Sequence, residues 1–220
     1  MNKKKFAFRV IFYCLGAFFT ALGVVLMING NLGVSAASSL SFVLSLVTGI
    51  DVGICFMAFF ALIITIQIVI LRKDFKLINL TQIIFAIMFG YFVILTEFIA
   101  GGIVFFSYPG RLLLLLTGNF LVALGVTMYV HAKLVPMPIE GLANTLVLKT
   151  KRPFYQMKIT VDCAIAISAL IISIAVFGRV YGLREGTIIS AVLIGWMIKL
   201  IQKVVHPVMD KLCFDQKEKT

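Results

Sequence analysis

Two acidic side chains in apolar surroundings are the residues of this chain best suited to do chemistry. Glu140 follows a proline-containing stretch and stands where a short helix is expected to begin. Asp162 lies four residues after Lys158 in an otherwise apolar run. A charge at membrane depth costs about 2.5–3.5 kcal/mol on insertion scales, so such a residue usually faces the interior of a helix bundle and has a function. Both carboxylates are therefore interpreted as carriers of a coupling proton, and Glu140 also as a substrate contact.

Each carboxylate also has a structural explanation that the sequence leaves open. Glu140 fits the first turn of a helix, where a carboxylate complements the positive end of the helix dipole. Asp162 could pair with Lys158 near the membrane interface, where an ion pair at this spacing contributes only tenths of a kcal/mol.

Polar residues near the other expected helix starts complete the candidate binding site. Arg184 and Glu185 stand at the start of the last apolar stretch. Glu185 suits a first helical turn, and Arg184 could neutralise an anionic ligand or pair with an acid across the bundle. The predicted substrate-binding residues are Ser38, Ser39, Glu140, Asn144, Arg184 and Thr187.

Catalytic and metal-binding patterns are absent from the sequence. His131 and His206 have no partners at ligand spacing, and the four cysteines lie far apart, so neither a metal site nor a disulfide framework is indicated. The sequence contains no nucleophile with a matching base and no phosphate-binding loop. We therefore expect a protein that is not an enzyme and that has no cofactor and no metal.

The elements that position these side chains are expected to be membrane spans. Hydrophobic residues make up 61% of the chain, charged residues 13%, and the mean hydropathy is +1.10, which is too apolar for a soluble domain. Crossing a bilayer takes roughly 20 apolar residues. The six stretches that approach this length are 6–29, 52–71, 77–99, 112–130, 159–177 and 186–205. The first follows a basic segment, as a signal peptide would, but it runs unbroken and is predicted to be a retained span.

The distribution of basic residues predicts the topology. The net charge of +11 could suggest nucleic acid, but 17 of the 20 Lys and Arg residues fall on one side of the six predicted spans. By the positive-inside rule, both termini are expected in the cytoplasm, including a tail of residues 206–220. The expected partner is therefore the lipid bilayer, with no nucleic acid.

An internal repeat divides the chain into halves. Residues 16–48 align without a gap to residues 118–150, with eleven identical pairs in 33 positions. Each half, 6–99 and 112–205, contains three predicted spans, and an odd number of crossings inverts the second half relative to the first. We therefore predict one all-α membrane domain (1–220) of six transmembrane helices in two inverted repeats. In transporters built this way the substrate site lies between the repeats.

A segment too long for a tight turn separates the first two spans of each half. In the second half, prolines before Ile139 and basic residues further on predict an extended run followed by a short re-entrant helix at 139–149. The repeat predicts the same arrangement in the first half, with a short re-entrant helix at 36–48. Two alternatives stay open: residues 31–50 could form a full crossing, and the second segment could be an amphipathic helix on the membrane surface.

Three motifs together resemble the YczE/YyaS/YitT family of bacterial membrane proteins. They are the run Met137–Leu142, the stretch from Lys158 to Asp162, and the run Arg184–Thr187. The resemblance covers most of the chain, from about Gly16 to Lys203. It implies a small multi-pass protein of the bacterial inner membrane for which transport is suspected.

The leading hypothesis is a secondary transporter of a small organic solute, proton-coupled and with an anionic group on the solute. The solute would bind near the membrane midplane between the two short-helix starts, whose positive ends favour a carboxylate. The alternative is a non-transporting accessory subunit of a transport, secretion or biosynthetic complex, docked through small residues such as Ala17 and Ala21. A homodimer, or a complex with another membrane protein, is compatible with both hypotheses. The sequence does not specify the substrate, the direction of transport or the coupling ion.

Overall fold

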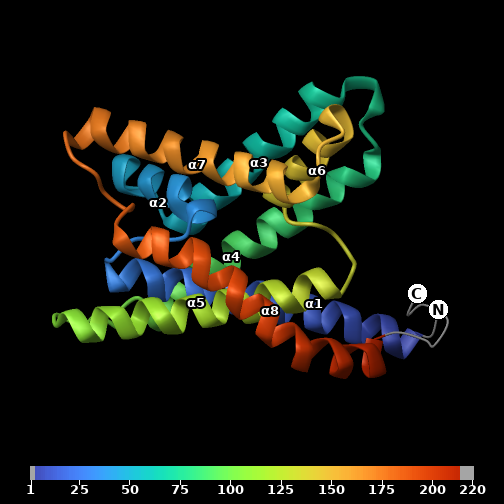
Figure 1. Cartoon of the computed structure of the whole chain (residues 1–220), viewed down its shortest axis with the longest axis horizontal. Coiled ribbons are helices and arrows are strands. Elements are labelled where there is room, and N and C mark those ends of the chain that lie inside the picture. Colours follow the sequence, from blue (N-terminus) through green and yellow to red (C-terminus); the bar gives the residue numbers. More distant parts are fainter. Residues whose placement is uncertain (1–2, 214–220) are drawn as a thin grey trace.

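The computed structural model describes residues 3–213 and is all-helical over that range, without a strand (Figure 1). Six helices are long and apolar enough to cross a membrane, so the predicted multi-pass all-α architecture is confirmed at this level. The elements are α1 (Lys3–Gly30), α2 (Ala36–Thr48), α3 (Val52–Leu71), η1 (Arg72–Asp74), η2 (Leu77–Thr81), α4 (Gln82–Ala100), α5 (Tyr108–His131), α6 (Pro138–Thr150), α7 (Phe154–Phe177) and α8 (Glu185–Cys213).

The long helices extend past the predicted apolar stretches. Helix α7 begins at Phe154 rather than residue 159, and α8 continues to Cys213 through Pro207. Part of the segment predicted as a tail is therefore helical, and its remainder, 214–220, lies outside the described residues. Hydropathy marks only the part of a helix that lies in hydrocarbon, whereas Lys and Gln, which are good helix formers, continue the backbone hydrogen bonding into water.

Two short helices occupy the breaks between the first and second long helix of each half. Helix α2 follows extended backbone at Ser35 and ends at Gly49, whose φ is +70°. Helix α6 begins with Pro138 at its first turn, where the missing N–H removes no helical hydrogen bond. Each has 13 residues, so residues 31–50 do not form a full crossing. Helix α6 packs between α3 and α7 with most of its first turns buried, so it is not a surface helix either.

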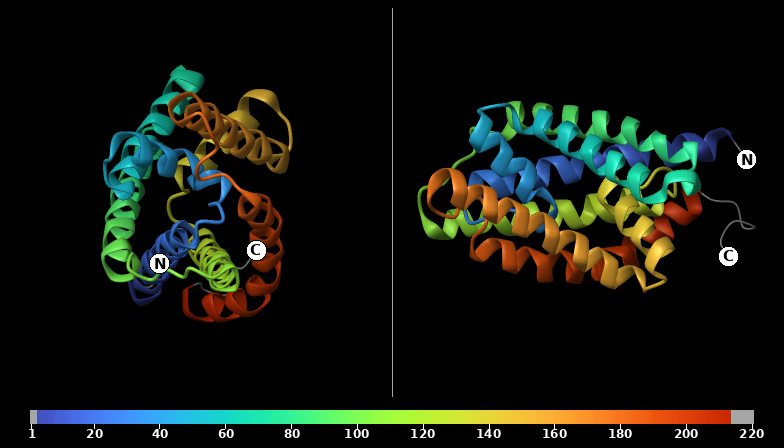
Figure 2. Two further views of the ribbon diagram at one scale, coloured as in Figure 1. Left: turned by 90° about the vertical axis from the view of Figure 1, so that its left-hand side faces the viewer. Right: turned by 90° about the horizontal axis from the view of Figure 1, so that it is seen from above.

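The helices pack around the pair formed by α1 and α5, which lie side by side (Figure 2). Helix α4 packs on α1, and α8 packs on α5. Helix α2 contacts α7 and α3, while α6 contacts α3 and α7. Helices α3 and α4 form a tight hairpin, but α7 and α8 diverge from the loop that joins them and make almost no direct contact (Figure 1).

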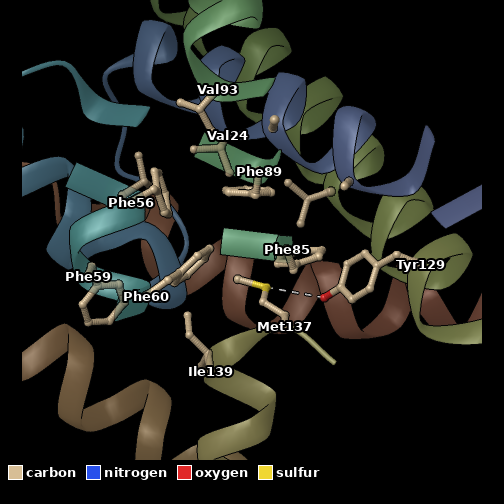
Figure 3. Close-up of a cluster of buried hydrophobic side chains, with 14 of the residues drawn as sticks. Val24, Phe56, Phe59, Phe60, Phe85, Phe89, Val93, Tyr129, Met137 and Ile139 are labelled. Carbon is tan, nitrogen blue, oxygen red and sulfur yellow. Dashed lines mark hydrogen bonds between the residues drawn. The ribbon is translucent and has the colours of Figure 1, made fainter. Parts of the chain in front are cut away.

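Aromatic rings fill the space between α3 and α4 (Figure 3). The ring centroids of Phe56 and Phe89 lie 5.3 Å apart, and those of Phe85 and Phe89 lie 5.8 Å apart. Phe85 also contacts Tyr129 of α5 at 5.6 Å. Such pairs contribute about 0.5–1.5 kcal/mol each beyond the area they bury, so this side of the molecule is closed by ring packing.

Four glycines set the distance between α1 and α5. A Cβ on Gly16 would lie 2.7 Å from the carbonyl oxygen of Gly125, and one on Gly23 would lie 2.6 Å from that of Gly118. Small residues let helix backbones approach closely, which is the main route to helix association in a membrane. The backbones of α1 and α5 are therefore in close contact at two positions along the helices, at Gly16 with Gly125 and at Gly23 with Gly118.

Replacing Gly118 by Ala should destabilise the protein by about 1–3 kcal/mol, because the added methyl group overlaps backbone and Met27 side-chain atoms that cannot move away. The measurement is the unfolding midpoint of the purified protein in detergent. Gly195→Ala on α8 is the matched control, since its Cβ meets no atom within 4 Å and alanine favours the helix by up to about 1 kcal/mol. Equal midpoints for the two variants would contradict this account of the crossing.

Candidate functional site

A central cavity of about 420 Å³ lies between the halves, and all eight α-helices, with the flanking Ser35 and Met137, contribute to its wall. Most of the wall is apolar, with Val24, Phe56, Phe89, Val122 and Val126 among its residues. The side chains of α7 that face it, including Ile159 and Cys163, lie opposite α8 residues such as Ile194. The cavity therefore occupies the space in which α7 and α8 fail to meet. Its size is in the range of about 300–1,000 Å³ that is typical of small-molecule sites.

Three charged side chains line this cavity, and among the described residues its wall has no others. The carboxylate of Glu140 accepts a hydrogen bond from the hydroxyl of Tyr129, with 2.8 Å between the oxygens. Lys158 Nζ donates to Asp162 Oδ1 at 2.9 Å, and both side chains keep 29% of their surface exposed. Two carboxylates face a single ammonium group, which leaves one negative charge in excess when all three are ionised.

A vestibule of about 530 Å³ adjoins the central cavity. The two share Tyr129, Glu140 and Lys158 on their walls, and Asn144 and Phe154 line the vestibule alone. It lies at the end of the molecule where α1 begins and α8 ends, since Arg9 of α1 donates to the backbone carbonyl of Ala132 just beyond α5. The charged side chains are therefore accessible from that end.

At the opposite end of the molecule, the segment before α2 is hydrogen-bonded to the loop before α8 and to the first turn of α8. The Gly186 amide donates to the Leu32 carbonyl at 2.8 Å, and the Val34 amide donates to the Gly182 carbonyl at 3.1 Å. Gly33 has a φ of +110°, and a Cβ there would lie 2.7 Å from Thr187 Oγ1. A glycine is needed at this position both for its conformation and for the close approach of α8.

A buried pair of glutamines fixes the start of α6, and with it Glu140. The Gln67 side-chain amide donates to Gln82 Oε1 at 3.0 Å and to the Pro138 carbonyl at 3.1 Å. Gln82 donates back to Gln67 at 3.2 Å. Gly141 makes room for both, because a Cβ there would lie within 2.9 Å of their amide atoms. The half-helix is thus hydrogen-bonded to the rigid α3–α4 hairpin.

The structure brings some of the predicted site residues together and separates others. Glu140, Asp162 and Ser38 line the central cavity, and Asn144 lines the vestibule. Ser39 is fully buried and donates to the Ala36 carbonyl, away from the cavity. At the closed end, Thr187 Oγ1 accepts from the Arg184 amide, and the exposed Arg184 side chain pairs with Glu185 and donates to the Asn31 carbonyl. None of these latter residues reaches the cavity wall.

Sequence reasoning missed several residues of the site. Tyr129, Gln67 and Gln82 are polar residues inside apolar spans, and this was the signal that could have identified them. Lys158 entered only as a partner for Asp162, although it lines the cavity together with both carboxylates. Their roles depend on contacts between helices far apart in the chain, which a single sequence does not show.

The two histidines, which have no partners at metal-ligand spacing in the sequence, lie together near the end of the molecule where α8 ends. Their rings stack with centroids 3.9 Å apart, and His131 Nε2 lies 2.8 Å from Asp210 Oδ1. Within residues 3–213, however, no group of three or more His, Cys, Asp or Glu side chains is arranged to hold a metal ion.

Comparison with known proteins identifies one family. The profile of a family described as "Family of unknown function (DUF6198)" matches residues 7–203, which is most of the chain. No curated protein and no solved structure matches. The resemblance to the YczE/YyaS/YitT family is not tested by this match and stays a prediction.

Replacing Gln67 by Leu should cost about 1–3 kcal/mol in stability, because it leaves the buried Gln82 amide and the Pro138 carbonyl without their partner. The double variant Q67L/Q82L should cost less than the sum of the two single variants, since it removes both halves of the pair. Unfolding midpoints of the three purified variants test this. Additive losses would show that the glutamines do not act as a pair.

Cys163 lines the cavity and should report which end is open. A charged, membrane-impermeant thiol reagent should modify it in proteoliposomes from the side where α1 begins, and not from the other side. Peptide mass spectrometry of Cys163 measures the modification, and the buried Cys55 serves as an internal control that stays unmodified. Preferential modification from the side where α5 begins would show that the cavity opens to that side instead.

Proposed function

This chain belongs to the family of unknown function DUF6198, and we propose that it is a proton-coupled secondary transporter of a small organic solute. The observation that carries the proposal is the central cavity, which has three charged groups on a mostly apolar wall and shares Tyr129, Glu140 and Lys158 with the vestibule at one end of the molecule. A cavity of this kind near mid-membrane, closed on one side by paired loops, is what one state of an alternating-access cycle requires.

The packing supports an arrangement of two inverted repeats. Equivalent helices under the sequence repeat are α1 and α5, α2 and α6, α3 and α7, and α4 and α8. The contact of α1 with α4 then corresponds to that of α5 with α8, and α2 on α7 corresponds to α6 on α3. The glycine contacts between α1 and α5 follow the same equivalence. The repeat pairs Gly16 with Gly118 and Gly125 with Gly23, so the Gly16–Gly125 contact corresponds to the Gly118–Gly23 contact.

Proton coupling is assigned to Glu140 and Asp162. Both carboxylates share one water-accessible cavity with a single cation, so binding a proton removes the excess negative charge. An ionised carboxylate is costly at membrane depth, which makes its protonation state sensitive to whether the cavity is open or closed. The assignment of substrate and proton to one cavity lets each influence the binding of the other.

The accessory-subunit hypothesis proposed that small residues of the first helix contact a partner protein, and these residues are not available. Ala17 and Ala21, the small residues that were to contact a partner, are fully buried within the chain itself. We place the protein in the bacterial inner membrane with both termini in the cytoplasm. On this orientation the vestibule faces the cytoplasm and the closed loops face outward.

Neutralising either carboxylate should uncouple transport. In proteoliposomes screened with amino acids, organic acids, amines and sugars, the protein should accumulate one solute class when a pH gradient is imposed. Asp162→Asn should reduce that accumulation to the level of empty liposomes while retaining exchange of labelled for unlabelled solute, since binding survives and proton movement does not. Glu140→Gln should reduce both accumulation and exchange, because Glu140 is also a predicted substrate contact.

Asp74→Asn is the matched control for this experiment. Asp74 is an exposed carboxylate bonded to Lys149 at 2.8 Å, away from both cavities, so the variant should accumulate solute normally. Unchanged gradient-driven accumulation in both cavity variants would refute the coupling assignment. Absence of flux for every solute class would refute the transport proposal itself.

A further inference from the structure

The wall of the central cavity reaches the outer surface of the molecule between α7 and α8. On α7, the exposed residues Ile159 and Cys163 line the cavity, and Ile159 is 59% exposed. On α8, the exposed residues Ala191 and Gly195 line the same cavity. A Cβ on Gly195 would meet no atom within 4 Å. Because the two helices make almost no direct contact, these residues border a lateral opening of the cavity.

The lateral opening lies at the depth of the hydrocarbon core. Gly195 is ten residues from Glu185, where α8 begins, and therefore lies about 15 Å along the helix. The hydrocarbon core is about 30 Å thick, so this distance is half of its thickness. Both helices are long and apolar enough to cross the membrane, and most of their surface is not buried within the chain. In a bilayer the opening therefore faces acyl chains and not water.

Glu140 carries the negative charge that is in excess in the cavity. Asp162 is paired with Lys158 at 2.9 Å, whereas Glu140 accepts a hydrogen bond from the uncharged hydroxyl of Tyr129. Glu140 also stands in the first turn of α6, where its charge compensates the positive end of the helix. An anionic ligand is therefore not favoured at this helix start, in contrast to the expectation from the sequence. The excess charge favours a cation.

The charged and apolar parts of the cavity follow one another along the membrane normal. Glu140 and Lys158 lie at the vestibule end, and Lys158 is four residues, or about 6 Å, from the start of α7. The opening at Gly195 lies deeper, and apolar residues such as Ile194 and Val24 line the wall. An amphiphile in the adjacent leaflet has the same order, because its charged headgroup lies at the membrane surface and its chain in the core.

We propose that the cavity binds a single-chain amphiphile with a cationic headgroup, which enters from the bilayer between α7 and α8. The headgroup pairs with Glu140, and the alkyl chain lies on the apolar wall and extends through the opening at Gly195. The pairing balances the excess charge, which is costly at membrane depth without a partner. The chain stays in apolar surroundings throughout. This inference rests on the proposed function and specifies its substrate class as a lipophilic cation.

Four probes separate the contributions of charge and chain. They are decyltrimethylammonium, decanoate, decanol and tetramethylammonium, which has the headgroup without the chain. Binding to the full-length protein in lipid nanodiscs is measured by calorimetry and by thermal stabilisation, with the signal of empty nanodiscs subtracted. We expect decyltrimethylammonium to bind at least about tenfold more tightly than each of the other three, because it alone combines a charge opposite to that of Glu140 with a chain for the apolar wall.

Glu140→Gln should weaken the binding of decyltrimethylammonium about tenfold, because it removes the charge while it keeps an acceptor for the Tyr129 hydroxyl. Asp74→Asn is the matched control, since it removes an exposed carboxylate that does not line the cavity, and it should leave the affinity unchanged. Equal effects of the two substitutions would overturn the position of the headgroup.

Gly195→Phe should also weaken the binding of decyltrimethylammonium about tenfold, because the ring occupies the opening through which the chain extends. Val192→Phe is the matched control on the same helix, since Val192 is 73% exposed and does not line the cavity. It should leave the affinity unchanged. If both variants bind as tightly as the unmodified protein, the chain does not lie between α7 and α8.

The remaining outcomes separate this inference from the transport proposal. Equally tight binding of decanoate, decanol or tetramethylammonium, or no binding of decyltrimethylammonium, overturns the site for a lipophilic cation. Binding of decyltrimethylammonium without its flux, or that of any other solute, in proteoliposomes supports the site and overturns transport. Flux of another solute class without binding of decyltrimethylammonium supports transport and overturns the site.

Discussion

The close crossing of α1 and α5 is the contact on which the rest of the structure depends. In a bilayer there is no hydrophobic driving force to bring helices together, so their association relies on close packing of small residues. Gly16 on Gly125 and Gly23 on Gly118 provide that packing at two levels. Helices α4 and α8 attach to opposite members of the pair, and the short helices reach the middle of the molecule from its two ends. The position of the cavity follows from this central pair.

The two halves of the sequence repeat differ at corresponding positions. Counting on at the spacing of the sequence repeat, 102 residues for α3 and α7, Phe56 corresponds to Lys158 and Phe60 to Asp162. Helices α4 and α8 align at a spacing of 105, which pairs Ile83 with Ile188 and Gly90 with Gly195, and at this spacing Phe85 corresponds to Ser190. The positions that close the α3–α4 side with aromatic rings are thus polar or charged on the α7–α8 side. One half has a packed aromatic core where the other has polar and charged residues on the cavity wall.

Much of the fold was predictable from the sequence, because its signals are local. Apolar stretches located the six long helices, and prolines before Ile139 located the start of α6 to within one residue. The start of α7 and the C-terminal end of α8 were missed, since hydropathy does not report helix outside hydrocarbon. Within the site, Glu140 and Asp162 stood out because charge is rare in apolar runs. Ser190 and Asn119 did not, because a small polar residue in a span is ordinary until its surroundings show that it has no partner.

The separation of α7 from α8 makes lipid a structural component of the second half. Burial within the chain covers 56% of the most apolar segment of α1 but only 6% of that of α8. Most of the surface of α8 is therefore not covered by this chain, and within the chain its position is set by α5, by α1 and by the loop before it. In the first half, ring packing between α3 and α4 stabilises the structure. In the second half, α7 and α8 are less buried within the chain, so we expect the surrounding membrane to contribute more to their stability. Bilayer thickness and fluidity then act on the two halves unequally, and α7 and α8 of the less buried half contribute many residues of the cavity wall.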